Sequence, residues 1–140
     1  MPVDDSRPIW VQLVSAFRTR IASGAWPASS RIPSVRELAL AEGVNPNTVQ
    51  RALGELDREG LTTAERAQGR FVTSDEALIG AVRRELAVGA TRDHAAALRG
   101  LGLGLDEATA LLEGHWNDSH SDSEGGAATG ADATARGGAR

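Results

Sequence analysis

The segment Val44–Gly60, VNPNTVQRALGELDREG, decides how this chain folds. Asn45 is a good N-cap residue, because its side chain can accept a hydrogen bond from a free amide at a helix start. Pro46 suits the first helical position, where a missing N–H costs nothing. Apolar residues then recur at helical spacing up to Gly60: Val49, Ala52, Leu53 and Leu56. The segment therefore predicts a short helix with one buried face.

The first half of this predicted helix carries no acid, because Glu55, Asp57 and Glu59 all lie in its second half. A helix start presents free amides and the positive end of the helix dipole, which suit phosphate. The DNA major groove admits such an end, and Asn, Gln and Arg side chains can pair there with base edges. An ordinary capped helix end facing solvent is the alternative, since Asn, Thr and Gln are common surface residues.

Two further helices are expected upstream of this segment. PSVRELALAEG contains Ser34 and Glu37 in the spacing of a capping box, and Gly43 ends it. Residues 8–23 place five apolar side chains on one helical face before Gly24: Trp10, Leu13, Val14, Phe17 and Ile21. Downstream, the runs LTTAE and RFVTS flank a turn that contains Gly69, which predicts a small hairpin. Three helices and a hairpin fit a mostly α, winged helix-turn-helix fold.

These motifs resemble, in order and spacing, the DNA-binding domain of the GntR family of bacterial transcription regulators. The resemblance covers residues 8–73 and is carried by PSVRELA, GVNPNTVQRAL, the L-x-x-EG ending and GRFV. It implies a winged helix-turn-helix that binds an inverted repeat as a dimer. Pro46 stands where many members have a basic contact residue, so one base or phosphate contact is lost here.

The resemblance also implies a set of DNA-binding residues. Arg36 matches a base-contacting arginine, and Ser34 matches a position near phosphate. Gly69 matches the glycine at the wing tip, which lets backbone approach the minor groove. The recognition-helix positions correspond to Asn45, Asn47, Thr48 and Gln50.

Three arginines near these positions are further candidates for DNA binding. Arg31 and Arg51 are expected to contact phosphate, and Arg70 follows Gly69 in the wing. Two alternatives stay open, because an ion pair with Glu37 or Glu42 could occupy Arg36, and Arg70 could be a plain surface charge.

Composition supports this reading once the chain is divided. The whole chain has a net charge of −4, which by itself argues against nucleic-acid binding. Residues 1–75 contain nine arginines and nine acids, whereas residues 76–140 contain six and ten, so the excess acid lies in the second part. The chain has no cysteine, no apolar run of membrane-spanning length and no signal peptide, so we expect a cytoplasmic protein.

Two more helices are predicted after the wing, which divides the chain into residues 1–74, 75–116 and 117–140. Such a short helical region resembles the YtrA-like members of the family, whose last helices serve mainly to dimerise. The predicted dimerisation stripe comprises Ile79, Val82, Leu86, Ala90, Leu101, Leu105, Leu111 and Leu112. The alternative is that these residues fold back on their own winged domain. A helix break near Gly89–Thr91 is also left open, and residues 117–140 are predicted to be disordered because they lack large apolar side chains.

The sequence thus predicts a homodimeric DNA-binding transcription regulator, most simply a repressor, that binds double-stranded DNA at an inverted-repeat operator. No enzyme, cofactor or metal site is expected, since no nucleophile, base and acid combine in a recognisable set. Any small-molecule effector would have to bind between the winged domain and the dimer helices or at the dimer interface. The alternative function is a winged-helix module that binds another protein in place of DNA. Steep salt dependence of DNA affinity would distinguish the two, because phosphate contacts release counterions.

Overall fold

The computed structural model describes residues 5–118, which divide into two compact units at Arg92–Asp93. The first unit contains α1 (Ile9–Ser23), α2 (Val35–Glu42), α3 (Pro46–Arg58), β1 (Thr62–Glu65), β2 (Gly69–Val72) and most of α4 (Glu76–Gly100). The second contains the end of α4 and α5 (Leu105–Trp116). The mostly helical winged helix-turn-helix predicted from the sequence, followed by two helices, is confirmed.

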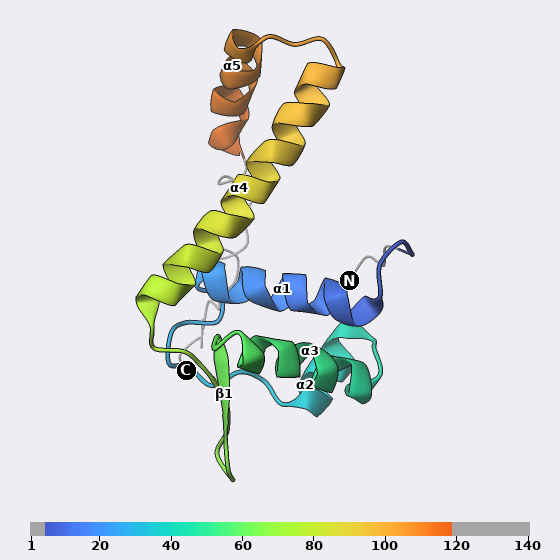
Figure 1. Ribbon diagram of the computed structural model, residues 1–140, viewed down its shortest axis with the longest axis vertical. Coiled ribbons are helices and arrows are strands. Elements are labelled where there is room, and N and C mark those ends of the chain that lie inside the picture. Colours follow the sequence, from blue (N-terminus) through green and yellow to red (C-terminus); the bar gives the residue numbers. More distant parts are fainter. Residues whose placement is uncertain (1–4, 119–140) are drawn as a thin grey trace, which may run out of the picture. The chain divides into compact units, whose positions relative to one another are not determined.

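The core of the first unit lies between α1 and α3, with α2 beside them (Figure 1). Leu61 and Thr62, where the hairpin starts, are almost fully excluded from solvent. So are the apolar side chains at helical spacing on α1 and α3: Leu13, Phe17, Val49, Leu53 and Leu56. Burying each such side chain contributes about 1.5–3 kcal/mol. This face fixes the rotation of α3, so its polar first half points outward.

Caps define the two helices of the helix-turn-helix. Ser34 Oγ accepts a hydrogen bond from the Glu37 amide at 3.1 Å, and the Glu37 side chain accepts one from the Ser34 amide, which completes the predicted capping box. Gly43 ends α2 in the left-handed conformation with φ of 66°. Asn45 Oδ1 then accepts from the Asn47 amide at 2.8 Å, with Pro46 as the first residue of α3.

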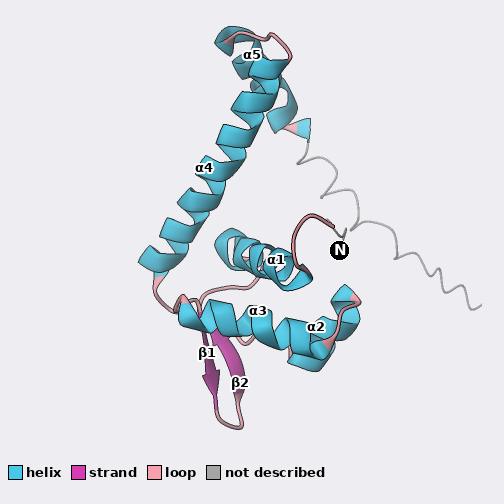
Figure 2. Ribbon diagram, turned by 45° about the vertical axis from the view of Figure 1, so that its right-hand side comes forward, coloured by secondary structure: helices cyan, strands magenta, loops and turns pink. Residues whose placement is uncertain are grey.

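The hairpin projects from the helices beside α3 (Figure 2). Its antiparallel register runs from Thr62 opposite Val72 to Glu65 opposite Gly69. The turn therefore consists of residues 66–68, with Ala67 in the left-handed region at φ of 64°. The expectation that Gly69 forms the wing tip was wrong. Gly69 is the first residue of β2, because strand pairing extends toward the turn as far as the Glu65–Gly69 pair.

A short extended segment before α2 pairs with strand β2. The Ile32 amide donates to the Arg70 carbonyl at 3.0 Å, and the Val72 amide donates to the Ser30 carbonyl at 2.9 Å. Arg31 forms an isolated bridge with Phe71 between these bonds. The segment before α2 and strand β2 are therefore held together by backbone hydrogen bonds.

The start of α4 packs on the winged unit, which corrects part of the predicted dimerisation stripe. Ile79 and Val82 are only 6% and 5% exposed within the core, and Leu86 packs against it while half-buried. Residues covered by their own domain have no apolar surface left for a partner. This part of the stripe packs on its own winged domain, because the first turns of α4 complete the core between α1 and α3.

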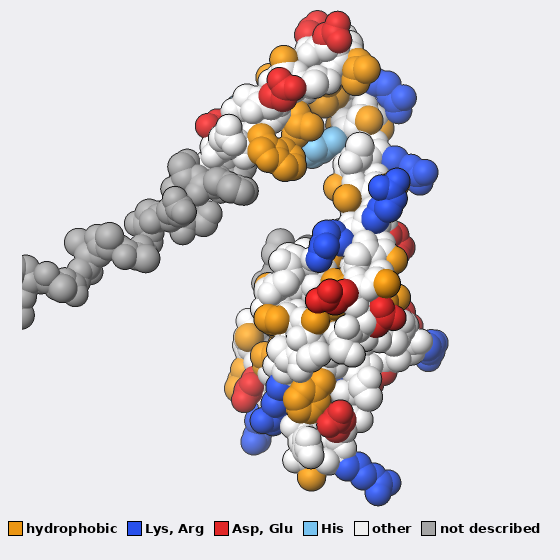
Figure 3. All heavy atoms as spheres, turned by 90° about the vertical axis from the view of Figure 1, so that its left-hand side faces the viewer, with side chains coloured by type: hydrophobic (Ala, Val, Ile, Leu, Met, Phe, Trp, Pro, Cys, Tyr) orange, Lys and Arg blue, Asp and Glu red, His pale blue; other side chains and the backbone are white. Residues whose placement is uncertain are grey.

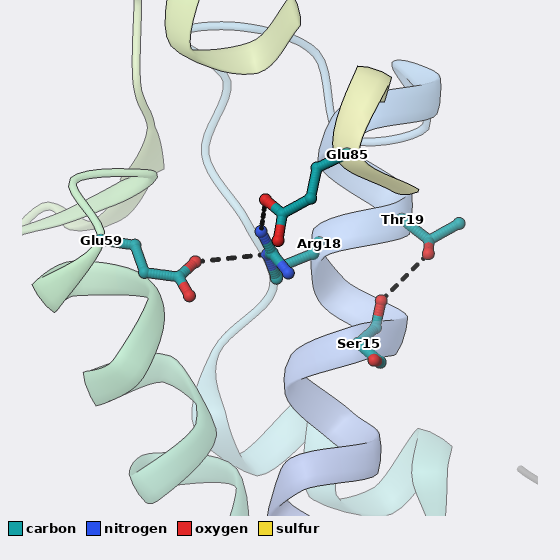
Figure 4. A network of polar contacts seen from close by, with 5 residues as sticks. All are labelled: Ser15, Arg18, Thr19, Glu59 and Glu85. Atoms are coloured by element: carbon teal, nitrogen blue, oxygen red, sulfur yellow. Dashed lines mark hydrogen bonds and ion pairs between the residues drawn. The ribbon is translucent and has the colours of Figure 1, made fainter. Parts of the chain in front are cut away.

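Arg18 joins three elements at the base of α4. Its guanidinium lies 2.8 Å from Glu85 of α4 and 3.3 Å from Glu59 at the end of α3 (Figure 4). The Nε atom is buried and lacks a well-aligned hydrogen bond, so its contact with Glu59 is an ion pair only. Arg83 adds a further tie by donating from Nε to the Ala22 carbonyl at 2.8 Å.

Helix α4 runs unbroken from Glu76 to Gly100, so the break considered near Gly89–Thr91 is absent, and only the end of α4 belongs to the second unit. Hydrophobic side chains gather on the surface of this unit (Figure 3). The exposed members are Leu101, Leu105, Leu111, Leu112 and Trp116. None of the helices in residues 5–118 is long and apolar enough to cross a membrane. Of the tail predicted to be disordered, residues 117–140, the part from residue 119 onward lies outside the described residues.

Gly54 provides a test of the α3 environment. It is a helix-interior glycine, and a Cβ placed there would meet no atom within 4 Å. We expect Gly54→Ala to raise the free energy of unfolding by about 0.5–1 kcal/mol, because alanine loses less backbone entropy in a helix. Urea denaturation followed by circular dichroism measures this.

Gly43→Ala is the matched control, because its site is equally open but its φ is positive. We expect this variant to lower the free energy of unfolding by roughly 1–2 kcal/mol. A loss of stability in Gly54→Ala would mean that position 54 contacts something other than solvent.

Candidate nucleic-acid interface

The start of α3 presents polar side chains without a carboxylate among them. Asn47 and Gln50 are exposed and Thr48 is half-buried, and the first turn contains no acid. The side-chain oxygen Oδ1 of Asn45 caps the helix, which leaves the side-chain nitrogen Nδ2 as a donor. This end of α3 therefore offers amides, hydroxyl and positive dipole to an approaching anion.

Arg36 lies exposed in the first turn of α2. Both carboxylates that could have paired with it are engaged elsewhere: Glu37 completes the capping box, and Glu42 forms an ion pair with Arg20. The side chain of Glu42 is buried in that pair. Among residues 5–118, no carboxylate forms an ion pair with Arg36, so its guanidinium is available to an external partner.

A groove of about 370 Å³ runs between the start of α2, α3 and the hairpin. We call it the wing groove. It brings together half of the residues predicted to bind DNA: Arg31, Ser34, Gln50, Gly69 and Arg70. The Glu65 side chain also lines it, so the groove is of mixed charge. Asn45, Asn47, Thr48, Arg36 and Arg51 do not line this groove.

Gly69 is favoured by its positive φ, and its backbone lies against the side chain of Arg31. A Cβ at position 69 would lie 2.7 Å from the Nε of Arg31, and the backbone there has a φ of 110°. The guanidinium of Arg31 therefore lies directly over the backbone of the wing at the strand pair next to the turn. Arg31 remains an exposed residue.

Arg70 is paired within the molecule. Its Nε and one terminal nitrogen donate to the two carboxylate oxygens of Asp57 at 3.1 and 3.0 Å. The hydroxyl of Thr62 donates to the same carboxylate at 2.5 Å. The side chain of Arg70 is only 15% exposed, so most of its donor surface is turned to Asp57 and away from solvent.

Arg51 stacks on Trp10, with the guanidinium carbon 4.1 Å from the ring centroid. This cation–π contact links α3 to the start of α1. Trp10 is half-buried, and one face of its indole is covered by Arg51. Arg51 is exposed overall, so its outer edge stays accessible.

Sequence reasoning missed Arg66 as a candidate contact. This exposed arginine begins the turn between β1 and β2, at the end of the hairpin farthest from Thr62 and Val72. The runs LTTAE and RFVTS had already placed it in the predicted turn, but no contact was assigned to it; the strand register puts it at the tip. The wing tip thus carries a cation, whereas the arginine next to Gly69 is paired with Asp57.

Comparisons with known proteins agree with this geometry. Residues 11–72 match the family model of bacterial regulatory proteins of the gntR family. The uncharacterized HTH-type transcriptional regulator YhcF of Bacillus subtilis is 30% identical over 109 residues, which is 78% of this chain and 88% of that protein. The HTH-type transcriptional repressor YtrA of the same organism is 36% identical over 70 residues, half of this chain and 54% of YtrA.

A solved structure extends the similarity beyond the wing. The GntR family transcriptional regulator from Listeria monocytogenes is 32% identical and superimposes with a TM-score of 0.71. The match covers 79% of this chain and 97% of that one, so it includes helical residues after the hairpin. The family model, a relative matched over most of its length and the acid-free start of α3 therefore agree: the chain is a DNA-binding transcription regulator, not an enzyme, and it belongs to the GntR family.

Proposed function

We propose that this regulator binds an inverted-repeat operator as a homodimer and represses transcription. In this proposal the start of α3 and Arg36 enter the major groove of each half-site. The observation that carries it is the exposed Arg36 beside an acid-free helix start, with Glu37 and Glu42 both engaged. An arginine with its donors free can pair bidentately with guanine.

The base-reading residues in this proposal lie on two helices. Asn47 and Gln50 are exposed on α3 and would read adenine edges, with Asn45 and Thr48 beside them. Ser34 and Arg31, at the wing groove, would face the adjoining phosphates. Arg51 would contact phosphate with the edge that its stacking on Trp10 leaves free.

The wing in this proposal contacts DNA through its tip. Arg66 is exposed in the turn and would approach the minor groove or its flanking phosphates. The Gly69 backbone lies under Arg31, so its lack of a side chain would let Arg31 lie flat on the outer part of the wing. This assigns the cationic contacts to Arg31 and Arg66.

The second unit would supply the dimer interface. Leu101 and Leu105 are 76% and 82% exposed, and Trp116 is 66% exposed, which is unusual for large apolar side chains in a single soluble unit. Ala90 is exposed on α4 as well. Pairing this surface with a second copy would cover it, and a two-fold pair of reading helices would match a palindromic operator.

Repression is the simplest outcome of such binding. A dimer on an operator that overlaps a promoter blocks polymerase without any further contact, and the relative YtrA is named a repressor. A small-molecule effector would need to bind beside the dimer surface, and none of the described residues requires one.

The salt dependence of binding tests the proposal as a whole. We expect the logarithm of the association constant to fall linearly with the logarithm of salt concentration, because each phosphate contact releases about 0.9 counterion. Fluorescence anisotropy with a duplex selected by the protein from random sequences measures the slope. A protein that selects no duplex at low salt would instead support the protein-binding alternative.

Arg36→Ala tests base reading. We expect it to weaken binding to the selected duplex by roughly 1–3 kcal/mol and to relax preference at one base pair of each half-site. Arg58→Ala is the control, since Arg58 lies at the far end of α3 and pairs with Glu55. Equal losses in the two variants would remove Arg36 from the reading face.

Leu105→Glu tests the dimer surface. We expect this charge to convert the protein to monomers, because a buried carboxylate without a partner is costly in an apolar interface. Sedimentation velocity measures the mass. Ala110→Glu on the same helix is the control, since an exposed small residue lies there and α5 keeps its other contacts. A dimeric Leu105→Glu protein would place the interface elsewhere.

A further inference from the structure

We propose that Arg70 is a positioning residue: with Asp57 and Thr62 it forms a clamp that fixes the wing to the recognition helix, and it does not itself contact DNA. This inference rests on the proposed function, in which the wing tip contacts DNA. It assigns a role to Asp57, an acid on the recognition helix that the DNA-binding set leaves out.

The clamp has the geometry of a strong, directional contact. Two hydrogen bonds of 3.1 and 3.0 Å join the Arg70 guanidinium to both oxygens of Asp57. Bidentate arginine–carboxylate pairs add angular specificity to charge attraction. The Thr62 hydroxyl donates to the same carboxylate from β1, so both strands of the hairpin are tied to one residue of α3.

The position of the clamp explains why the wing needs it. Arg70 pairs with Ala64 in the strand register, one pair from the Glu65–Gly69 pair that adjoins the turn. A two-stranded hairpin with four-residue strands is marginally stable by itself. Thr62 is 2% exposed at the base of β1, while the outer residues of that strand are exposed. The clamp therefore holds the outer half of the hairpin, where core packing ends.

Charge also argues against a direct DNA contact by Arg70. If Arg70 left Asp57 for a phosphate, a partly covered carboxylate on α3 would lose its cation beside the DNA backbone. Arg66 and Arg31 are exposed, and among the described residues neither forms an ion pair that a phosphate contact would break. The neutral Asp57–Arg70 pair instead removes an acid charge from the reading helix.

Asp57→Asn distinguishes the two roles of Arg70, because they predict opposite signs. The clamp predicts that this variant binds the selected duplex about tenfold more weakly, since the wing loses its bidentate anchor. A direct phosphate contact predicts equal or tighter binding, because Arg70 is freed and an acid is removed. Anisotropy titration at a temperature where circular dichroism shows the fold intact decides between them.

A double-mutant cycle with Arg66→Ala tests how the clamp acts. If the clamp works by placing the wing tip, Arg70→Gln should cost affinity in the wild-type background and little more in the Arg66→Ala background. Arg70→Lys should behave like Arg70→Gln, because an ammonium cannot form the bidentate pair. Additive losses, or wild-type affinity in Arg70→Lys, would overturn the clamp.

A measurement without DNA separates this inference from the proposed function. The chain has no cysteine, so spin labels can be placed at Ala67→Cys in the wing tip and Arg58→Cys at the end of α3. We expect a narrow distance distribution in the otherwise wild-type chain and a broader one in Asp57→Asn. An unchanged width would refute the clamp even if DNA binds as proposed.

Thr62→Val keeps the test decisive if Asp57→Asn fails to fold. Valine fills a similar volume and favours a strand, but it removes the hydroxyl that donates to Asp57. We expect a smaller broadening and a smaller loss of affinity in the same direction. A broadened wing in a protein that binds no duplex at all would keep the clamp and reject the proposed function.

Discussion

The pairing of carboxylates within the winged unit is the constraint on which the proposed DNA-contacting surface depends. A chain with more acids than arginines approaches DNA more readily where most acids near the contact surface are paired or engaged. Glu42 pairs with Arg20, Asp57 with Arg70, and Glu37 caps α2. Arg36 and Arg66 are exposed, and within the described residues neither forms an ion pair with an acid.

Packing then determines where those free groups point. The apolar face of α3 is covered by α1, and the first turns of α4 close the same core through Ile79 and Val82. Rotation of α3 would expose its buried leucines, so its polar first half is fixed toward solvent. The hairpin, which has little core of its own, depends instead on backbone bonds to the segment before α2 and on polar contacts with α3.

Local features of the sequence sufficed for the helices and their ends, because caps, glycine stops and apolar spacing act within a few residues. Ser34, Asn45 and Gly43 were assigned correctly on that basis. Contacts between distant segments were not predictable in the same way. Helical spacing showed that Ile79 and Val82 share a face with later leucines, but it could not show that the face is divided between the core and solvent. The partners of Arg51 and Arg70 are likewise set by tertiary structure.

Arg18 illustrates how unequally the partners in one contact should tolerate substitution during evolution. One guanidinium serves two carboxylates, from Glu59 and Glu85. Loss of either acid leaves a balanced pair, whereas loss of the arginine, whose side chain is only 18% exposed, removes both ion pairs at once. Sequence drift should therefore be permissive at the two acids and restrictive at position 18, so the surface around this site can diversify while its centre stays fixed.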